Sequence, residues 1–190
     1  MIIGLTGTNA AGKSTIAKYL AKRGFASYSL SDELRDILKI KGLEPTRDNL
    51  VSIGNEMRTK FGNSYLAERV LRKASENSVV DSIRNLGEID AFRKRGNFIL
   101  IAVDAPLEAR YQRAKERGRV AEGESLQQFM EKEARELKAA SKNMQQLEAC
   151  MLEADFSIIN ASNVQSLYWQ VETIIKKAGG VIGEQTAELG

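Results

Sequence analysis

Near the start of the sequence, Ile2-Ile3-Gly4-Leu5-Thr6 runs directly into Gly7-Thr8-Asn9-Ala10-Ala11-Gly12-Lys13-Ser14. The first part is short, β-branched and free of charge, which is typical of a strand buried on both faces of a parallel sheet. The second part fits the pattern G-x-x-x-x-G-K-[ST]. An amphipathic pattern follows, with Ile16, Tyr19 and Leu20 on one helical stripe. A strand, a glycine-rich loop and a helix in this order predict a loop that binds phosphate groups.

Each fixed position of this loop has a chemical reason. Glycine lets the backbone turn tightly and bring its N–H groups against phosphate oxygens. The helix that opens at Lys13 points unpaired N–H groups and the positive end of its dipole at the same anion. Lys13 is expected to reach the β- and γ-phosphates, and the Ser14 hydroxyl to bind Mg²⁺. The sequence therefore predicts ATP and Mg²⁺ as ligands, held by Gly7, Thr8, Asn9, Ala10, Ala11, Gly12, Lys13, Ser14 and Thr15.

The composition excludes several other classes of function. The 190 residues suit one globular domain, and 43% hydrophobic with 28% charged residues is close to soluble globular usage. The absence of His excludes every His-based mechanism, and a single Cys, Cys150, excludes disulfide frameworks and Cys-rich metal sites. The net charge of +3 is too small to indicate a nucleic-acid partner.

Membrane insertion and secretion are not expected. No apolar run approaches the ~20 residues that span a bilayer. The sequence turns polar by Thr8, unlike a secretory signal, and the single Cys fits a reducing compartment. We expect a cytoplasmic protein, either a monomer or a homodimer.

The rest of the chain alternates between strand and helix patterns. Further strands are expected at Phe25–Leu30, Ser78–Ile83, Phe98–Val103 and Phe156–Ile159. Strands separated by helices predict an α/β fold of three layers around a five-stranded parallel sheet. Two connections are long. One carries helices at Asp32–Ile40, Thr46–Phe61 and Tyr65–Ser75, and the other begins with an Arg-rich helix at Leu107–Arg117.

Two later motifs extend the argument beyond the loop: Ser31-Asp32-Glu33-Leu34-Arg35, and Asp81-Ser82-Ile83-Arg84 after Val79-Val80. With them the chain resembles the P-loop kinases of small phosphorylated metabolites, such as adenylate kinase, deoxynucleoside monophosphate kinases and dephospho-CoA kinase. The resemblance is strongest to the archaeal proteins similar to adenylate kinase or dephospho-CoA kinase. It covers residues 1 to about 177 as a single domain, and residues 178–190 are expected to be a loosely packed tail.

The resemblance gives the two long connections a function. Residues of about 31–76 become the helices that bind the phosphate acceptor, and residues of about 113–140 become a lid with its following helix. It also implies that Asp32 lies near the phosphates and that Arg35 binds the acceptor phosphate. The residues alone allow another interpretation, in which Ser31 or Asp32 only caps a helix.

At the end of the third expected strand, Asp81 and Arg84 are candidate site residues. A carboxylate at the end of a buried strand is costly unless it meets a cation, and Mg²⁺ beside a phosphate-binding loop is the natural partner of Asp81. Arg84 would then hold the acceptor phosphate. Ser82 stands where the resembling kinases have Gly. The alternative is that Asp81 caps a helix beginning near Leu86.

Arg110, Arg113 and Arg117 are spaced to share one helix face, and Arg119 follows. Like charges on one surface repel each other unless an anion lies among them. The resemblance makes these residues part of a lid that stabilises the transferring phosphoryl group, with Arg113 and Arg117 matching the lid spacing best. The alternative is a solvated basic face.

The last candidates concern the two bound molecules. The resemblance implies that the turn at Asn160 holds the adenine, although Asn160 can also be a turn former, with Ser162 or Asn163 as a helix cap. Arg47 and Arg58 lie in a segment that looks like the acceptor region of deoxynucleotide kinases. There, Tyr65 is placed to stack on a base.

The sequence thus predicts Mg²⁺-dependent phosphoryl transfer from ATP to a small phosphorylated acceptor, with a (deoxy)nucleoside monophosphate as the leading class. Dephospho-CoA is an alternative acceptor; its hydroxyl would need a base, for which Asp32 is the candidate. A P-loop ATPase or a nucleotide-gated binding or assembly protein is an alternative from another class. Internal salt bridges on Arg35 and Arg84 would favour that third hypothesis.

Overall fold

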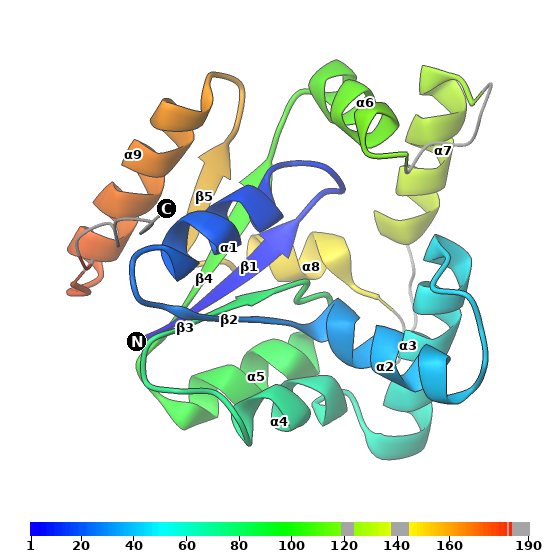
Figure 1. The fold of residues 1–190 in the computed structure, drawn as a ribbon, viewed down its shortest axis with the longest axis horizontal. Coiled ribbons are helices and arrows are strands. Elements are labelled where there is room, and N and C mark those ends of the chain that lie inside the picture. The colour runs from blue at the N-terminus through cyan, green and yellow to red at the C-terminus, as the bar shows by residue number, and fades with distance from the viewer. Residues whose placement is uncertain (119–123, 138–144, 182, 184–190) are drawn as a thin grey trace, which may run out of the picture.

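One parallel sheet forms the centre of the computed structural model, which describes residues 1–118, 124–137, 145–181 and 183 (Figure 1). Its strands within these residues are β1 (Ile2–Gly7), β2 (Ala26–Ser29), β3 (Ser78–Asp81), β4 (Phe98–Asp104) and β5 (Phe156–Ile159). They lie in the order β2-β3-β1-β4-β5, and every pairing is parallel. The predicted five-stranded parallel sheet is confirmed.

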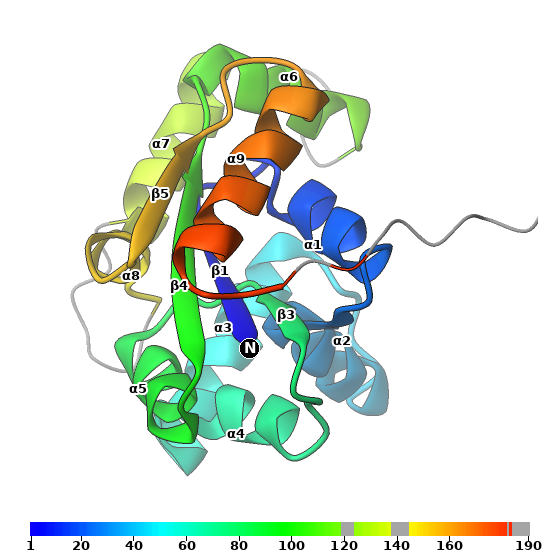
Figure 2. The ribbon, with the colours of Figure 1, turned by 90° about the vertical axis from the view of Figure 1, so that its left-hand side faces the viewer.

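Helices cover both faces of this sheet. The helices of the described residues are α1 (Lys13–Ala21), α2 (Leu30–Ile40), α3 (Arg47–Phe61), α4 (Tyr65–Leu71), α5 (Leu86–Arg95), α6 (Leu107–Glu116), α7 (Leu126–Leu137), α8 (Leu147–Leu152) and α9 (Val164–Lys177). Helices α1 and α9 pack on one face, and α4, α5 and α8 on the other (Figure 2). Three layers result, as predicted.

Alternate residues of the central strands enter the two opposite cores. In β1, Ile3 and Leu5 join the core under α1 and α9, whereas Ile2 joins the core on the other face. In β4, Ile101 joins the core under α1 and α9, and Leu100 joins the core on the other face. Because both faces are covered, these strands are continuously apolar, which is the signal that the sequence carried.

Three expected boundaries differ from the structure by two residues or more, and several others by one. Leu30 begins α2 rather than ending β2, so the helix starts before Ser31 and Asp32, and the predicted cap at those residues is wrong. Strand β3 ends at Asp81 because Ser82 turns the backbone to φ 69°, in the left-handed region. Helix α4 ends at Leu71, before the predicted end at Ser75.

Side-chain caps fix the start of three other helices. Thr46 accepts a hydrogen bond from the Asn49 amide (3.2 Å) at α3, and Asn163 accepts one from the Ser166 amide (2.9 Å) at α9. Helix α5 begins with a capping box between Asn85 and Glu88. Asn85, rather than Asp81, therefore caps the helix at Leu86.

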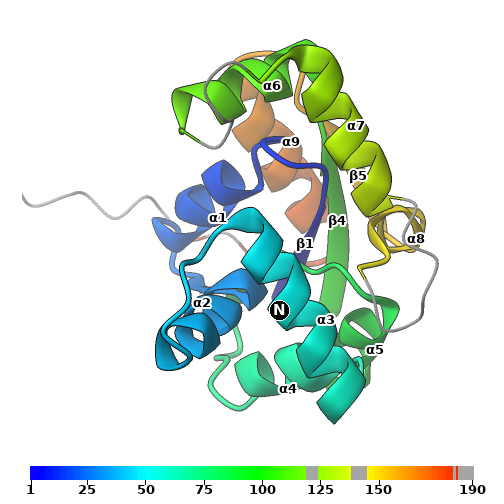
Figure 3. The ribbon, with the colours of Figure 1, turned by 90° about the vertical axis from the view of Figure 1, so that its right-hand side faces the viewer.

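The phosphate-binding loop, the α6–α7 unit and the pair α2–α3 meet at the carboxyl ends of the strands. Figure 3 shows α2 and α3 on one side of α1 and α6 on the other. Ligands of parallel α/β sheets bind at this edge. Among the described residues, no helix combines the length and the apolar character that crossing a membrane requires.

The buried carboxylate of Glu33 offers a test of how α2 is held to α4. Its oxygens accept hydrogen bonds from Arg69 Nε (2.9 Å) and from Lys73 Nζ. Burial by itself raises the pKa of Glu33, but the two cations together outweigh burial and hold the pKa below its ordinary value. A depressed pKa adds stability above the pKa of the unfolded chain, and this stability is lost as the pH falls through the folded-state pKa.

We therefore expect Glu33→Gln to lower the free energy of unfolding at pH 7 by about 1–3 kcal/mol. The difference from the natural chain should shrink as the pH falls below about 4. Urea unfolding at pH 7 and at pH 3 measures both values. An equal difference at the two pH values would contradict the role assigned to the Glu33 carboxylate.

Candidate functional site

The glycines of the loop between β1 and α1 are required by space as well as by conformation. Gly7 has φ 125°, and a Cβ atom there would lie 1.9 Å from the carbonyl oxygen of Val103. Gly12 has φ 114°, and a Cβ atom there would lie 2.5 Å from Asn160 Nδ2. Only glycine adopts this backbone conformation without strain and also leaves the space that a Cβ atom would fill, so the structure explains both fixed glycines of the motif.

Lys13 is buried at the base of the loop. Its Nζ donates hydrogen bonds to the carbonyl oxygens of Gly7 (2.8 Å) and Thr8 (2.6 Å). Burial lowers the pKa of Lys13 to about 8, an effect that Asp81 opposes and Arg84 reinforces. An anion bound in the loop would offer this ammonium group better partners than backbone carbonyls.

A cleft of about 620 Å³ extends from this loop to α2 and α3. Asn9, Ala10, Ala11, Gly12, Lys13 and Ser14 line one end of it. Gly7 and Thr8 lie at the base of the loop, and Thr15 lines a neighbouring depression on α1. The volume falls within the range of small-ligand sites.

Two side chains with oxygen atoms suited to bind a magnesium ion line this cleft. Ser14 lies in the first turn of α1, and Asp81 lies at the end of β3, where one carboxylate oxygen accepts the Ser82 amide (2.5 Å). Among the described residues, no group of three or more potential metal-ligating side chains is found. A hydroxyl and one carboxylate fit a Mg²⁺ that takes its other ligands from phosphates and water.

Ser82 takes the left-handed backbone conformation at the position where the resembling kinases have Gly. Its hydroxyl lies within 3.5 Å of the hydroxyls of Ser29 and Ser31. The unusual conformation turns the chain away from β3 and places Arg84 beside the cleft. Ser82 thus adopts a backbone conformation that glycine would adopt without cost, and does so at a cost in backbone strain.

Arginines from several elements line the cleft beyond the P-loop. Arg35 NH1 donates to Asp32 Oδ1 (2.6 Å) and to Ser31 Oγ (2.9 Å), and both Arg35 and Asp32 are exposed at the edge of the cleft. Arg84 NH1 donates to Gln145 Oε1 (2.9 Å). Arg47, in the first turn of α3, completes this set.

Arg58 reaches the cleft from a buried position on α3. Its Nε and NH2 donate to Glu88 Oε1 (3.0 and 2.7 Å), and both side chains are almost fully buried. The other oxygen of Glu88 accepts the backbone amides of Arg84 (2.8 Å) and Asn85 (3.1 Å). The remaining Arg58 nitrogen, NH1, is buried without a hydrogen-bond partner in the described protein atoms. Arg58 thus retains one donor for an additional ligand.

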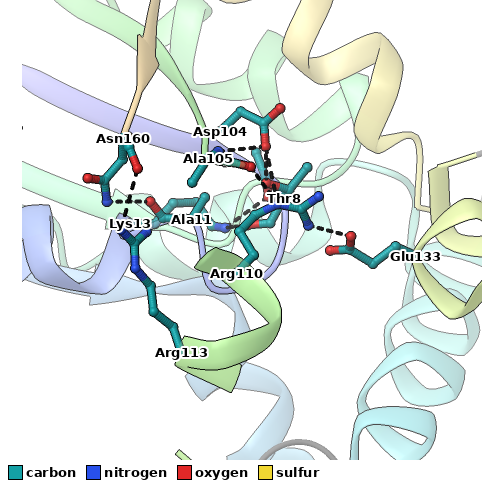
Figure 4. A network of polar contacts seen from close by, with 10 residues as sticks. Thr8, Ala11, Lys13, Asp104, Ala105, Arg110, Arg113, Glu133 and Asn160 are labelled. Atoms are coloured by element: carbon teal, nitrogen blue, oxygen red, sulfur yellow. Dashed lines mark hydrogen bonds and ion pairs between the residues drawn. The ribbon is translucent and has the colours of Figure 1, made fainter. Parts of the chain in front are cut away.

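The predicted row of lid arginines separates in the structure (Figure 4). Arg110 turns away into a buried ion pair with Glu133 of α7 and is not part of the row. Arg113 NH2 lies 3.4 Å from the Asn160 carbonyl oxygen, and Arg117 NH1 lies 3.4 Å from Ser14 Oγ. The alternative of a solvated basic face is wrong for Arg110, which is buried. Arg119 lies outside the described residues.

Asn160 supports the loop from the end of β5. Its side-chain Nδ2 donates to the Ala11 carbonyl oxygen (2.8 Å), and its backbone amide donates to Asp104 O (2.7 Å). Sequence reasoning expected only a turn or an adenine contact here. The adenine contact stays a prediction, and Asn163 rather than Ser162 caps the following helix.

Sequence reasoning missed Glu88, Asp104, Glu133 and Gln145. Glu88 had a readable signal, because Asn85-Leu86-Gly87-Glu88 has the spacing of a capping box. Asp104 directly follows an apolar strand, as Asp81 does. Glu133 and Gln145 had no signal, since each meets its arginine only through the tertiary fold.

The loop and the strand order define a P-loop NTPase with the layout of the small-molecule kinases. Shikimate kinase from Aquifex aeolicus shares the fold at 16% identity and TM-score 0.54, over 94% of this chain and 98% of that one. Shikimate kinase from Bacteroides thetaiotaomicron shares it at 13% identity and TM-score 0.59, over 94% and 98%. A family model described as an AAA domain matches residues 3–138.

Sequence relatives place the chain more narrowly. The UPF0200 protein TK1334 of Thermococcus kodakarensis is 30% identical over 184 residues, which is 92% of this chain and 96% of the relative. A UPF0200 protein of Thermococcus onnurineus is 32% identical over 186 residues, or 93% and 97% of the two chains. The chain belongs to the UPF0200 family and carries its AAA domain.

Proposed function

We propose that this protein transfers the terminal phosphoryl group of Mg²⁺-ATP to a small phosphorylated acceptor, with a (deoxy)nucleoside monophosphate as the leading class. One observation carries the proposal: a single cleft joins the P-loop to a second half that is lined by arginines and apolar side chains. A protein that only hydrolysed ATP would have no need of this second half.

The charges of the cleft support anionic occupants. Its cations include Lys13, Arg35, Arg47, Arg58, Arg84 and Arg117, whereas its described carboxylates are Asp32 and Asp81. Glu88 offsets the charge of Arg58 from below the lining. The cations that line the cleft still outnumber these carboxylates, so the cleft attracts anions, and guanidinium groups match phosphate geometry. A triphosphate with its metal and a phosphate-bearing acceptor would together balance it.

The acceptor half also has an apolar wall. Leu34, Pro45, Leu50, Val51 and Leu66 line it between α2, α3 and α4. A flat ring would pack against this wall while its phosphate reached the arginines. This combination favours an acceptor with an aromatic base over a small polar metabolite.

Asp32 supports a phosphate rather than a hydroxyl as the nucleophile. A hydroxyl acceptor, as in dephospho-CoA, would need Asp32 as its base. The Asp32 carboxylate is instead bonded to Arg35 and largely exposed. A phosphate oxygen needs no such base, so we retain the nucleoside monophosphate as the leading acceptor and dephospho-CoA as the alternative.

In the proposed reaction an acceptor oxygen forms a bond to the γ-phosphorus while the bond to the β–γ bridging oxygen breaks and ADP leaves. The chain contributes position and charge. Lys13 and the loop amides would hold the donor phosphates, and Arg84, Arg58 and Arg35 the acceptor. Arg117, which lines the cleft, would act on the transferring group; Arg113 lies outside the lining, beside Asn160, and would have to turn into the cleft to join it. When bound by Ser14 and Asp81, Mg²⁺ would neutralise charge on the donor phosphates.

A second candidate is a P-loop ATPase or nucleotide-gated binding protein. The observation that favours it is that Arg35 is bonded to Asp32 and Arg84 to Gln145. If these contacts persist when nucleotide binds, the arginines cannot serve an acceptor.

A panel assay separates these candidates. Purified protein with Mg²⁺-ATP is offered each common ribonucleoside and deoxyribonucleoside monophosphate and dephospho-CoA in turn, and ADP formation is measured above the background without acceptor. The proposal expects at least one monophosphate to raise the rate by about tenfold or more, with a matching phosphorylated product. Lys13→Ala protein from the same purification controls for contaminating kinases. ADP formation that no acceptor stimulates would overturn the proposal in favour of the ATPase.

A further inference from the structure

The tip of the P-loop packs against helices α6 and α7. Ala10 forms a small apolar core with Ala114 of α6 and Phe129 of α7, and all are almost fully buried. The ring of Phe129 meets that of Tyr111 edge to face, with centroids 5.7 Å apart. This contact gives the α6–α7 unit a direct connection to the loop, away from the acceptor half.

A chain of polar contacts makes a second connection between the same elements (Figure 4). The Thr8 hydroxyl donates to Asp104 Oδ1 (2.5 Å), which also accepts the Ala105 amide (2.8 Å). Arg110 Nε donates to the Ala105 carbonyl oxygen (2.8 Å) and lies 3.6 Å from Asp104 Oδ1. Arg110 NH1 completes the chain in its ion pair with Glu133.

This series of polar contacts ends at Lys13, the lysine proposed to hold the donor phosphates. The carbonyl oxygen of Thr8 accepts a hydrogen bond from Lys13 Nζ (2.6 Å), so whatever fixes Thr8 also fixes this partner of Lys13. Buried ion pairs are weak sources of stability, and apolar side chains of similar volume often replace them without loss. The pair between Arg110 and Glu133 is therefore poorly explained by stability alone.

We propose that Glu133 and Arg110 are positioning residues for nucleotide binding: Glu133 orients Arg110, which holds the Asp104–Ala105 segment against Thr8 and thereby sets the geometry of Lys13. This rests on the proposed function only in that the P-loop must bind a nucleotide. The α6–α7 unit then does more than carry lid arginines, because it also shapes the donor site before the donor arrives.

The decisive variant is Glu133→Gln, which keeps the shape of the side chain and removes its charge. We expect it to weaken Mg²⁺-ATP binding by roughly tenfold in calorimetry. Arg110 would then lack its partner and move from Ala105, which would loosen Thr8. The matched control is Glu33→Gln, which also removes a buried carboxylate from its cations but lies between α2 and α4. We expect that control to lose stability and to keep its affinity for ATP.

A conservative variant gives a readout that general destabilisation would not move. Glu133→Asp keeps the carboxylate that pairs with Arg110, so it should bind Mg²⁺-ATP about threefold or more tighter than Glu133→Gln does. Glu33→Asp and Glu33→Gln should bind Mg²⁺-ATP alike, because their side chain lies between α2 and α4.

The outcomes are distinct. If the natural chain binds no ATP, the proposed function fails before this inference is reached. If it binds ATP and folded Glu133→Gln matches it within twofold, the inference is overturned. A loss of affinity that Glu133→Asp does not recover in part would overturn it as well. If Glu133→Gln fails to fold, Thr8→Val interrupts the same series of polar contacts at its other end. It is expected to weaken ATP binding by a similar factor, and unchanged binding would overturn the inference.

Discussion

Lys13→Ala is expected to lower phosphoryl transfer from ATP by about a hundredfold to a thousandfold. The variant removes the ammonium group that the fold holds inside the P-loop, where it donates hydrogen bonds to the carbonyl oxygens of Gly7 and Thr8. The variant should remain folded, because a buried ammonium whose pKa has fallen to about 8 contributes little to stability. Turnover assays with calorimetric ATP binding, and thermal unfolding of both proteins, measure these effects.

The pH dependence of ATP binding tests the same residue in the natural chain. Lys13 is charged below its pKa of about 8 and neutral above it, so affinity for a polyanion should decline as the pH rises through that value. Lys13→Ala should show no such decline. Lys22→Ala, which removes an exposed lysine at the end of α1, is the matched control and should behave like the natural chain. Unchanged turnover in Lys13→Ala would refute the role of the loop.

Arg117→Ala is expected to reduce the catalytic rate by about a thousandfold while changing ATP affinity by about tenfold or less. Arg117 follows α6, and its NH1 lies 3.4 Å from Ser14 Oγ, beside the proposed magnesium ligand. A cation there would act most strongly on the charge that develops as the phosphoryl group moves. Steady-state kinetics for the rate and calorimetry for the affinity separate the two effects.

Lys115→Ala provides the control for Arg117→Ala. Lys115 lies in the last turn of α6, is exposed, and does not line the cleft among the described residues. Its loss should leave both the rate and the affinity nearly unchanged. A loss of ATP affinity with little loss of rate in Arg117→Ala would contradict a lid role, because that pattern indicates a contact that is equally strong before and during transfer.

Much of the fold was predictable because its signals are local. The apolar run Ile2–Thr6 indicated a strand buried on both faces, and the glycines of the loop follow from backbone conformation and close contact. The errors have local causes as well. Leu30 looked like the end of an apolar strand, yet its side chain is equally buried as the first residue of α2. Ser82 gave no sign that it would take a glycine-like conformation.

The site was less predictable, because its arginines are sorted by partners that are distant in sequence. Spacing placed Arg110, Arg113 and Arg117 on one helix face, but whether each faces the cleft depends on what packs against it. Glu133 binds Arg110 in a buried ion pair, and Glu88 binds most of the Arg58 guanidinium in another, so the bonded nitrogen atoms are not available to the cleft. Such pairings arise only when helices pack, and a helical period carries no information about them.

The Glu88 carboxylate has one more consequence for how the molecule would enclose its substrates. It joins Arg58 of α3 to the backbone of Asn85 at the start of α5, and these three residues are buried. By contrast, Arg35 and Arg117 are exposed, and they come from α2 and from the end of α6, which lie on either side of α1 (Figure 3). Enclosure of the substrates would therefore be asymmetric. The buried guanidinium of Arg58 would stay in place, and the exposed guanidinium groups of Arg35 and Arg117 would move toward it.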